Sequence, residues 1–191
     1  SNLYTPFPNF RTLQPNMKYF AGNHVTSVFS QGNPEPAGEM CHLRAYVSAK
    51  LLWNPDCDLD AVVDDFLEGY YGQAGKYIKE YMTLLHDNLE KSGEELSIFG
   101  NALTPVNGYL SPENLDAYSQ CFDKAEKVVA DDKDLTARVQ FARLPVIFAE
   151  LEQASLMPVG KRGFLIDGKD GDLSVNEDFM HKLDHFISCC K

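Results

Sequence analysis

The sequence predicts a mainly α-helical protein, and three observations support this fold class. From Glu35 onward, apolar residues recur at the three-to-four-residue spacing of amphipathic helices. Ser111 followed by Pro112 is a strong helix start, because proline at the first helical position gives up no hydrogen bond that the helix needs. The 191 residues are 44% hydrophobic, enough for one sizeable core. We expect helices at residues 36–53, 58–71, 74–91, 112–130, 134–155 and 177–189.

The first 34 residues differ in character from the rest. Residues 16–21 can form one or two helical turns, residues 25–29 are typical of a short β-strand, and QGNP at residues 31–34 is typical of a loop. We therefore divide the chain into residues 1–34 and a helical domain at residues 35–191.

Residues 51–72, LLWNPDCDLDAVVDDFLEGYYG, combine a helix stop with a helix start. Proline disfavours the α conformation of the residue before it, so Asn54 before Pro55 ends one helix. Asp58 can cap the next, and Gly72 can close it in a left-handed conformation. The helix between them should bury an apolar face made of Leu59, Val62, Val63, Phe66, Leu67, Tyr70 and Tyr71.

The second half of the chain carries three local signals. Pro145 lies inside a helical pattern, so we expect a kink or break there. Residues 157–176, rich in Gly, Lys and Asp, should form a long irregular segment that ends in a helix cap at Asn176. The helix after Ser111 should bury Leu115, Tyr118, Phe122, Ala125 and Val129.

Composition disfavours several classes of partner. Seventeen basic and 28 acidic residues give a net charge of −11, which repels nucleic acids and anionic lipid surfaces. No apolar run approaches the roughly 20 residues of a membrane span. Five cysteines without CxxC spacing do not indicate a disulfide framework. We predict no nucleic-acid partner and no membrane span.

Three patterns resemble metal sites. Asn54, Asp56, Asp58 and Asp60 alternate like the start of a calcium loop, and residues 167–178 are similarly acidic, but neither segment has the full ligand spacing. His181, His185 and Cys189 share one stripe of the last helix, a geometry that zinc can use, but HExxH is missing. Helix capping and a polar helix face explain these residues better. We predict no metal and no cofactor.

Catalytic motifs are not evident in the sequence. No GxSxG, phosphate loop or dinucleotide fingerprint is present. Asp60, Asp64 and Glu68 share a helix face, where a solvated surface is the simpler explanation than an acid–base pair. Trp53, Tyr70 and Tyr71 could stack on sugar rings, although core or domain-interface packing fits their spacing better. We therefore expect no catalytic residue and no activity of this chain by itself.

Two segments resemble a known family. PFPNFRTLQPNMKYFAGNHVTSVFSQGN and GEMCHLRAYVSAKLLWNPDCDLDAVVDDFLEGYYG are similar to the core of the DUF4838 family, proteins of unknown function common in polysaccharide-degrading gut bacteria. The part LLWNPD is also similar to the segment after the barrel in α-glucuronidase glycoside hydrolases. The resemblance covers about residues 5–90.

The resemblance implies a (β/α)8 barrel followed by a helical C-terminal region. A barrel takes about 250 residues, so the chain would be the C-terminal part of a longer protein, with residues 25–29 as the last barrel strand. Loops after barrel strands hold substrates. The residues that could bind sugar hydroxyls at that mouth, or near it, are Gln31, Asn33, Glu39 and Arg44. The alternative is a strand-to-helix turn with a helix-capping glutamate and a surface ion pair.

Two functions remain open. The first is the C-terminal helical domain of a carbohydrate-active, glycoside-hydrolase-like protein, which supports the barrel or its substrate cleft and has a surface for packing or homo-oligomerisation. The second is a non-catalytic helical module that binds a glycan or a protein partner independently. In the first case a polysaccharide or oligosaccharide would be the partner of the full-length protein. The family resemblance implies a periplasmic or secreted location.

Overall fold

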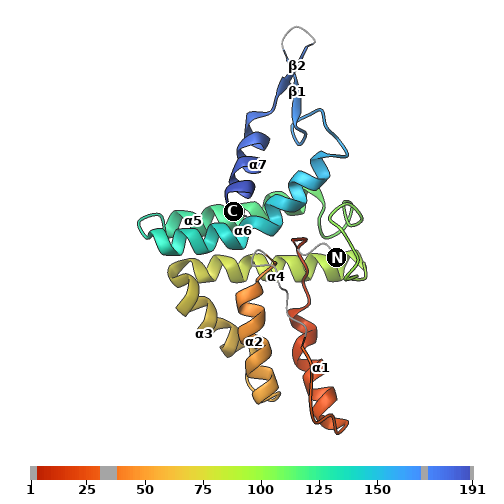
Figure 1. Ribbon diagram of the computed structural model, residues 1–191, viewed down its shortest axis with the longest axis vertical. Coiled ribbons are helices and arrows are strands. Elements are labelled where there is room, and N and C mark those ends of the chain that lie inside the picture. The colour runs from red at the N-terminus through yellow and green to blue at the C-terminus, as the bar shows by residue number, and fades with distance from the viewer. Residues whose placement is uncertain (1–3, 31–37, 169–171, 190–191) are drawn as a thin grey trace.

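The computed structural model describes residues 4–30, 38–168 and 172–189, and it confirms a mainly helical fold (Figure 1). In chain order the elements are α1 (Phe10–Gly22), α2 (Cys41–Trp53), α3 (Leu59–Tyr71), a 3-10 turn (Gly72–Ala74), α4 (Gly75–Ser92), α5 (Pro112–Val128), α6 (Lys133–Ala154), β1 (Leu165–Asp167), β2 (Leu173–Val175) and α7 (Glu177–Cys189).

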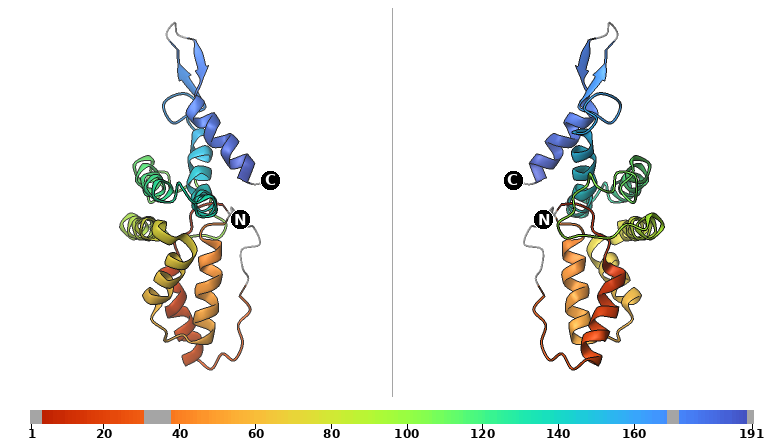
Figure 2. Two further views of the ribbon diagram at one scale, coloured as in Figure 1. Left: turned by 90° about the vertical axis from the view of Figure 1, so that its left-hand side faces the viewer. Right: turned by 90° about the vertical axis from the view of Figure 1, so that its right-hand side faces the viewer.

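The helices form three tiers along the long axis of the molecule. Helices α4, α5 and the first half of α6 run side by side across the middle, and α1, α2 and α3 extend below them (Figure 1). The second half of α6, α7 and the β1–β2 hairpin extend above (Figure 2). Helix α7 and the β1–β2 hairpin therefore lie far from the lower ends of α1 and α2 (Figure 1).

Helix starts follow the predicted capping signals. The Asp58 side chain accepts a hydrogen bond from the Ala61 amide, and Ser111 accepts one from the Asn114 amide. Asp132 caps α6 in the same way. Each such cap stabilises its helix by about 1 kcal/mol. The local signals read from the sequence therefore set where α3 and α5 begin.

The main core lies between the lower and middle tiers. The predicted buried face of α5 is confirmed, since Leu115, Tyr118, Phe122 and Ala125 are all buried. Tyr81 of α4 packs edge-on against Tyr118, with ring centroids 5.5 Å apart. Phe10 belongs to the same core. A smaller core between α6 and α7 contains Ile147, Leu151, Ala154 and Phe179.

Helix α3 buries less than its pattern predicted. Only Leu67 and Tyr71 are buried, while the other apolar residues of its predicted face are partly exposed and pack at the edge of the core. Gly72 does have a positive φ of 56°, but its ψ of −131° leads into a 3-10 turn rather than a left-handed cap. The chain therefore continues directly from α3 into α4.

Pro145 bends α6 without breaking it. The helix continues from Lys133 to Ala154, and Figure 2 shows its second half turning upward from the first. Proline removes one main-chain hydrogen bond and crowds the preceding turn, which produces such a bend. The bend directs the end of α6 toward α7.

Two segments differ from the predicted elements. Residues 25–29 are extended but form no strand, because no neighbouring strand lies beside them in the described part of the chain. The strands lie instead at Leu165–Asp167 and Leu173–Val175, which pair antiparallel within the segment predicted to be irregular. The predicted helix at residues 16–21 extends over Phe10–Gly22, and the one at residues 36–53 begins only at Cys41, after a left-handed Met40.

Among the described helices, none is both long and apolar enough to cross a membrane.

Candidate functional site

The four predicted sugar-binding residues fall into two groups. Gln31 and Asn33 lie outside the described residues. The structure brings Glu39 and Arg44 together, with Glu39 Oε2 2.8 Å from Arg44 Nη2. The Glu39 side chain is 3% exposed, whereas that of Arg44 is 21% exposed. A sugar would reach Arg44 more readily than Glu39, and direct binding by either residue stays a prediction.

Arg44 ties the N-terminal segment to α2. Its guanidinium donates to the Phe7 carbonyl at 3.2 Å and to the Asn9 side chain. It also lies over the Phe10 ring, 4.6 Å from the centroid. These contacts satisfy a half-buried cation on several sides. The pair thereby holds the start of α1 against the start of α2.

Glu39 is a buried acid with a shifted pKa. Burial raises the pKa of Glu39 to about 7, against the opposing effect of the Arg44 charge. The hydroxyl of Tyr81 is fully buried and has no hydrogen-bond partner among the described residues. Burial raises the pKa of Tyr81, and the Glu39 charge adds to that shift. The carboxyl group therefore lies in a water-poor environment where a proton is readily retained.

His86 is a second titratable residue that contacts the start of α1. The Phe10 amide donates to His86 Nε2 at 3.1 Å, and His86 Nδ1 lies 2.7 Å from the Met82 carbonyl. Nδ1 must carry the proton in this arrangement, because Nε2 accepts. Burial lowers the pKa of His86. The first residue of α1 is therefore held by a neutral histidine.

The lower end of the molecule exposes apolar side chains, which we call the apolar tip. Phe29 and Trp53 are each 92% exposed, and the remaining members are 38–66% exposed: Tyr19, Val25, Val28 and Leu52. They come from the end of α1, the extended segment 25–30 and the end of α2, which occupy the lower part of the molecule (Figure 2). Trp53 is therefore not packed in the core of this chain, and its packing at a domain interface stays a prediction.

Polar contacts hold the elements of the apolar tip together. Gln14 of α1 donates to the carbonyls of Pro55 and Cys57, at 3.0 and 2.7 Å. Lys18 lies 3.4 Å from Asp56. The turn after α2 is therefore fixed against α1, which gives Trp53 a defined place on the surface.

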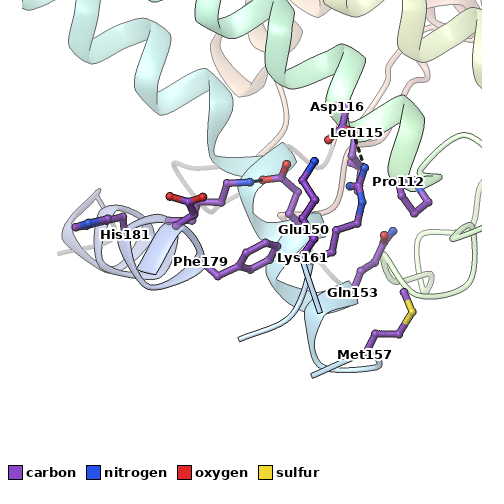
Figure 3. A pocket seen from close by; sticks show the side chains of 12 residues that line it. Pro112, Leu115, Asp116, Glu150, Gln153, Met157, Lys161, Phe179 and His181 are labelled. Carbon is purple, nitrogen blue, oxygen red and sulfur yellow. Dashed lines mark hydrogen bonds and ion pairs between the residues drawn. The ribbon is translucent and has the colours of Figure 1, made fainter. Parts of the chain in front are cut away.

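The upper tier contains a cavity of about 370 Å³ between α5, α6, α7 and the loop before β1, which we call the upper pocket. Figure 3 shows side chains from all four elements gathered around it. The polar residues that line it include Asp116, Glu150, Gln153, Lys161, Arg162 and Lys182. A cavity of this size lies within the range of small-molecule sites.

Two ion pairs form opposite parts of the upper pocket. Arg162 Nη2 lies 2.6 Å from Asp116, and Lys182 Nζ lies 2.7 Å from Glu150. Glu150 is buried and also accepts from the Ser119 hydroxyl at 3.3 Å. This pocket was not predicted from the sequence. A usable signal was Glu150 inside the apolar run of α6, because a buried acid is retained only where partners satisfy it.

The acidic patterns of residues 54–60 serve local structure. The Asn54 side chain accepts from the Asp56 amide at 3.0 Å, and Asp58 caps α3. On the predicted acidic face of α3, Asp64 pairs with Lys79 at 2.5 Å. These contacts agree with capping and a solvated face as the simpler explanations.

In the last helix, the predicted stripe is only partly assembled. His185 and Cys189 approach to 3.8 Å, while His181 is exposed and lines the upper pocket. Asn176 directly precedes α7, and its side-chain amide donates to the carbonyls of Lys161 and Gly163, at 3.2 and 2.8 Å. Asn176 thus fixes the loop that carries Lys161 and Arg162.

The segment that carries the apolar tip and the Glu39–Arg44 pair is also the segment with a family match. Residues 1–83 match the model of the DUF4838 family. DUF4838 is a domain of unknown function, so the match confirms the predicted family without indicating a reaction. No curated protein and no solved structure is significantly similar to the chain. The DUF4838 match covers α1, α2, α3 and the first part of α4, whereas the upper pocket lies outside it.

Proposed function

We propose that the chain is a non-catalytic helical part of a larger carbohydrate-active, glycoside-hydrolase-like protein, and that the apolar tip packs against the sheet of its barrel. The observation that carries this proposal is the extended segment 25–30. Its apolar side chains are exposed, and it has no neighbouring strand in the described part of the chain. A strand that completes a sheet elsewhere has these properties when it is seen without that sheet.

The energetics favour a covered apolar tip. Burial of a large apolar side chain contributes about 1.5–3 kcal/mol of gross transfer free energy, so Phe29 and Trp53 alone give a docking partner a substantial gain. A long unpaired segment with apolar side chains is also prone to aggregation. Both considerations support a partner surface that pairs with residues 25–30 and covers Trp53.

The acidic groups of the DUF4838 segment support a structural role. Glu39 is nearly inaccessible and paired, and Asp64 forms a surface ion pair with Lys79. A glycosidase needs two carboxyl groups placed on either side of an accessible glycosidic bond. We therefore assign the catalytic carboxylates of the proposed protein to its barrel.

The test uses the parent protein that contains this chain and its preceding residues. Phe29→Asp should place a charge in the proposed interface and release the helical region, seen as faster limited proteolysis between the two parts. Thr12→Asp, a change of an exposed residue on α1 outside the apolar tip, serves as the control. Equal proteolysis of the two variants and the unsubstituted protein would contradict the proposal.

Glycan binding is the second candidate, and the 92% exposure of Trp53 favours it. An exposed indole can stack on a sugar ring, and Trp53 is the one tryptophan of the chain, so its fluorescence reports binding directly. We expect no saturable change of Trp53 fluorescence with neutral or acidic oligosaccharides, since the proposed role of the apolar tip is docking. A saturable change that Trp53→Ala abolishes would instead support the glycan-binding module.

A further inference from the structure

We propose that the upper pocket binds a neutral, polyhydroxylated ring of about monosaccharide size. This site is separate from the apolar tip, and the inference does not rest on the proposed function. The upper pocket lies outside the DUF4838 match and combines fixed polar groups with apolar side chains on one cavity of about 370 Å³.

The charge balance of the upper pocket selects a neutral ligand. Three cationic side chains line it, Lys161, Arg162 and Lys182, and three carboxylates oppose them, Asp116, Glu150 and Asp178. Arg162 pairs with Asp116 and Lys182 pairs with Glu150. The remaining Lys161 and Asp178 carry opposite charges, so the lining is neutral as a whole, and a charged ligand would disturb this balance in a partly enclosed site. Hydroxyl groups both donate and accept hydrogen bonds, so a ring with several of them suits walls that alternate donors and acceptors.

The buried groups of the upper pocket are held in place before any ligand arrives. Gln153 is 6% exposed, and its Nε2 donates to the carbonyls of Ala102 and Leu110, at 3.1 and 2.8 Å. Its Oε1 accepts no hydrogen bond from the described residues. Because Gln153 lines the upper pocket, this oxygen is an acceptor for a ligand hydroxyl. Groups fixed in this way lower the entropic cost of binding.

Apolar side chains provide a surface for the carbon face of a ring. Leu115, Met157 and Phe179 contribute to the lining (Figure 3). Lys161 reaches the same space from the loop that Asn176 fixes, and it forms no ion pair within residues 4–30, 38–168 and 172–189. The Lys161 ammonium is thus a donor available to a ligand hydroxyl.

The test titrates the 191-residue chain with D-glucose, D-galactose and D-xylose and follows backbone amide shifts by NMR. We expect saturable shifts around the upper pocket, with an affinity of about 1 mM, the value for a binding free energy of about −4 kcal/mol. Glucuronate and glucosamine, the charged counterparts, should bind about tenfold more weakly, because either charge disturbs the neutral balance of the lining.

Variants separate binding from folding. Arg162→Ala and Lys161→Ala should each weaken sugar binding at least fivefold, whereas Lys91→Ala, a change of an exposed lysine on α4 outside the pocket, should leave it unchanged. Lys161 is exposed, so Lys161→Ala retains the fold if Arg162→Ala does not. The proposal fails if no neutral sugar gives saturable shifts, if glucuronate, glucosamine or inorganic phosphate binds more tightly, or if Lys161→Ala binds as the unsubstituted chain does.

Discussion

The Phe10 amide and His86 Nε2 are joined by a hydrogen bond of 3.1 Å, which places a titratable ring at the start of α1. Protonation of Nε2 would set an N–H group against the N–H group of Phe10. The buried donor would then lack an acceptor, at a cost of about 1–3 kcal/mol. The packing of α1 is thereby linked to the charge of His86.

His86 should make the stability of the chain depend on pH. Its pKa in the folded chain is lowered by burial, so the unfolded chain binds more protons below its ordinary pKa of about 6.5. The stabilising contribution is complete above that pH and is lost as the pH falls toward the folded pKa. In urea unfolding at pH 7.5, 6.5 and 5.5, the contribution of His86 to the free energy of unfolding should therefore decrease as the pH falls.

Glu39 has the opposite effect, so a variant is needed to separate the two groups. Its pKa is raised to about 7, and its contribution is present below about pH 4.5 and lost as the pH rises through 7. His86→Gln offers an acceptor that does not titrate. On acidification the original chain should lose more free energy of unfolding than His86→Gln does. A stability difference that does not change with pH would contradict the role of His86.

Removal of Arg44 should destabilise the chain strongly. Above pH 7, where Glu39 with its pKa of about 7 is ionised, Arg44→Ala leaves a buried carboxylate without its partner, which costs about 3–5 kcal/mol. Acidification to pH 5 should reduce the loss, because Glu39 then takes up a proton. Arg11→Ala is the matched control, since Arg11 pairs with Asp87 and Glu90 on the surface and such pairs contribute about 0–1 kcal/mol. If Arg44→Ala and Arg11→Ala lower the free energy of unfolding equally, the structural role of the Glu39–Arg44 pair is contradicted.

Gly75 should be required for the close packing of α4 on α3. A Cβ atom there would lie 2.6 Å from the Leu67 carbonyl oxygen, so Gly75→Ala should lower the free energy of unfolding by about 1–3 kcal/mol. A Cβ atom at Gly69 would meet no atom within 4 Å, and Gly69→Ala should raise stability by about 0.5–1 kcal/mol, because alanine favours the helix. Thermal unfolding of the two variants measures these opposite changes in stability. A Gly75→Ala chain as stable as the original would contradict the close approach of α4 to Leu67.

The apolar tip should contribute nothing to the stability of the chain alone. Phe29→Ser and Trp53→Ser change side chains that are 92% exposed, and such surface changes alter the free energy of unfolding by less than about 0.5 kcal/mol. Both variants should instead reduce self-association, measured by sedimentation at rising protein concentration. A large loss of stability would show that the apolar tip is part of the fold rather than a docking surface.

Local signals predicted most of the helical architecture. The Ser111–Pro112 start and the Asp58 cap depend on residues within one helical turn, so the sequence alone identifies them. Residues 25–29 show the limit of such signals. Their pattern is that of a strand, but a strand also needs a neighbour, and none lies beside them in the described residues.

The candidate sites depend on contacts between distant residues. Asp116 and Arg162 are 46 positions apart in the sequence, and the bend of α6 that helps to bring their elements together follows from Pro145 and the packing above it. The Glu39–Arg44 pair likewise involves a distant segment, because Arg44 donates to the Phe7 carbonyl 37 positions away. Sequence patterns indicate which side chains are polar, but not which of them a fold removes from water.

Hydrogen exchange of residues 26–30 tests the docking of the apolar tip most directly. In the 191-residue chain these amides should exchange rapidly, because the segment is extended and lacks a neighbouring strand. In the parent protein the same amides should exchange at least about a hundredfold more slowly, since strand pairing of even ~3 kcal/mol gives protection of this order. Equally rapid exchange in both proteins would contradict the proposal that this segment completes the sheet of a larger protein.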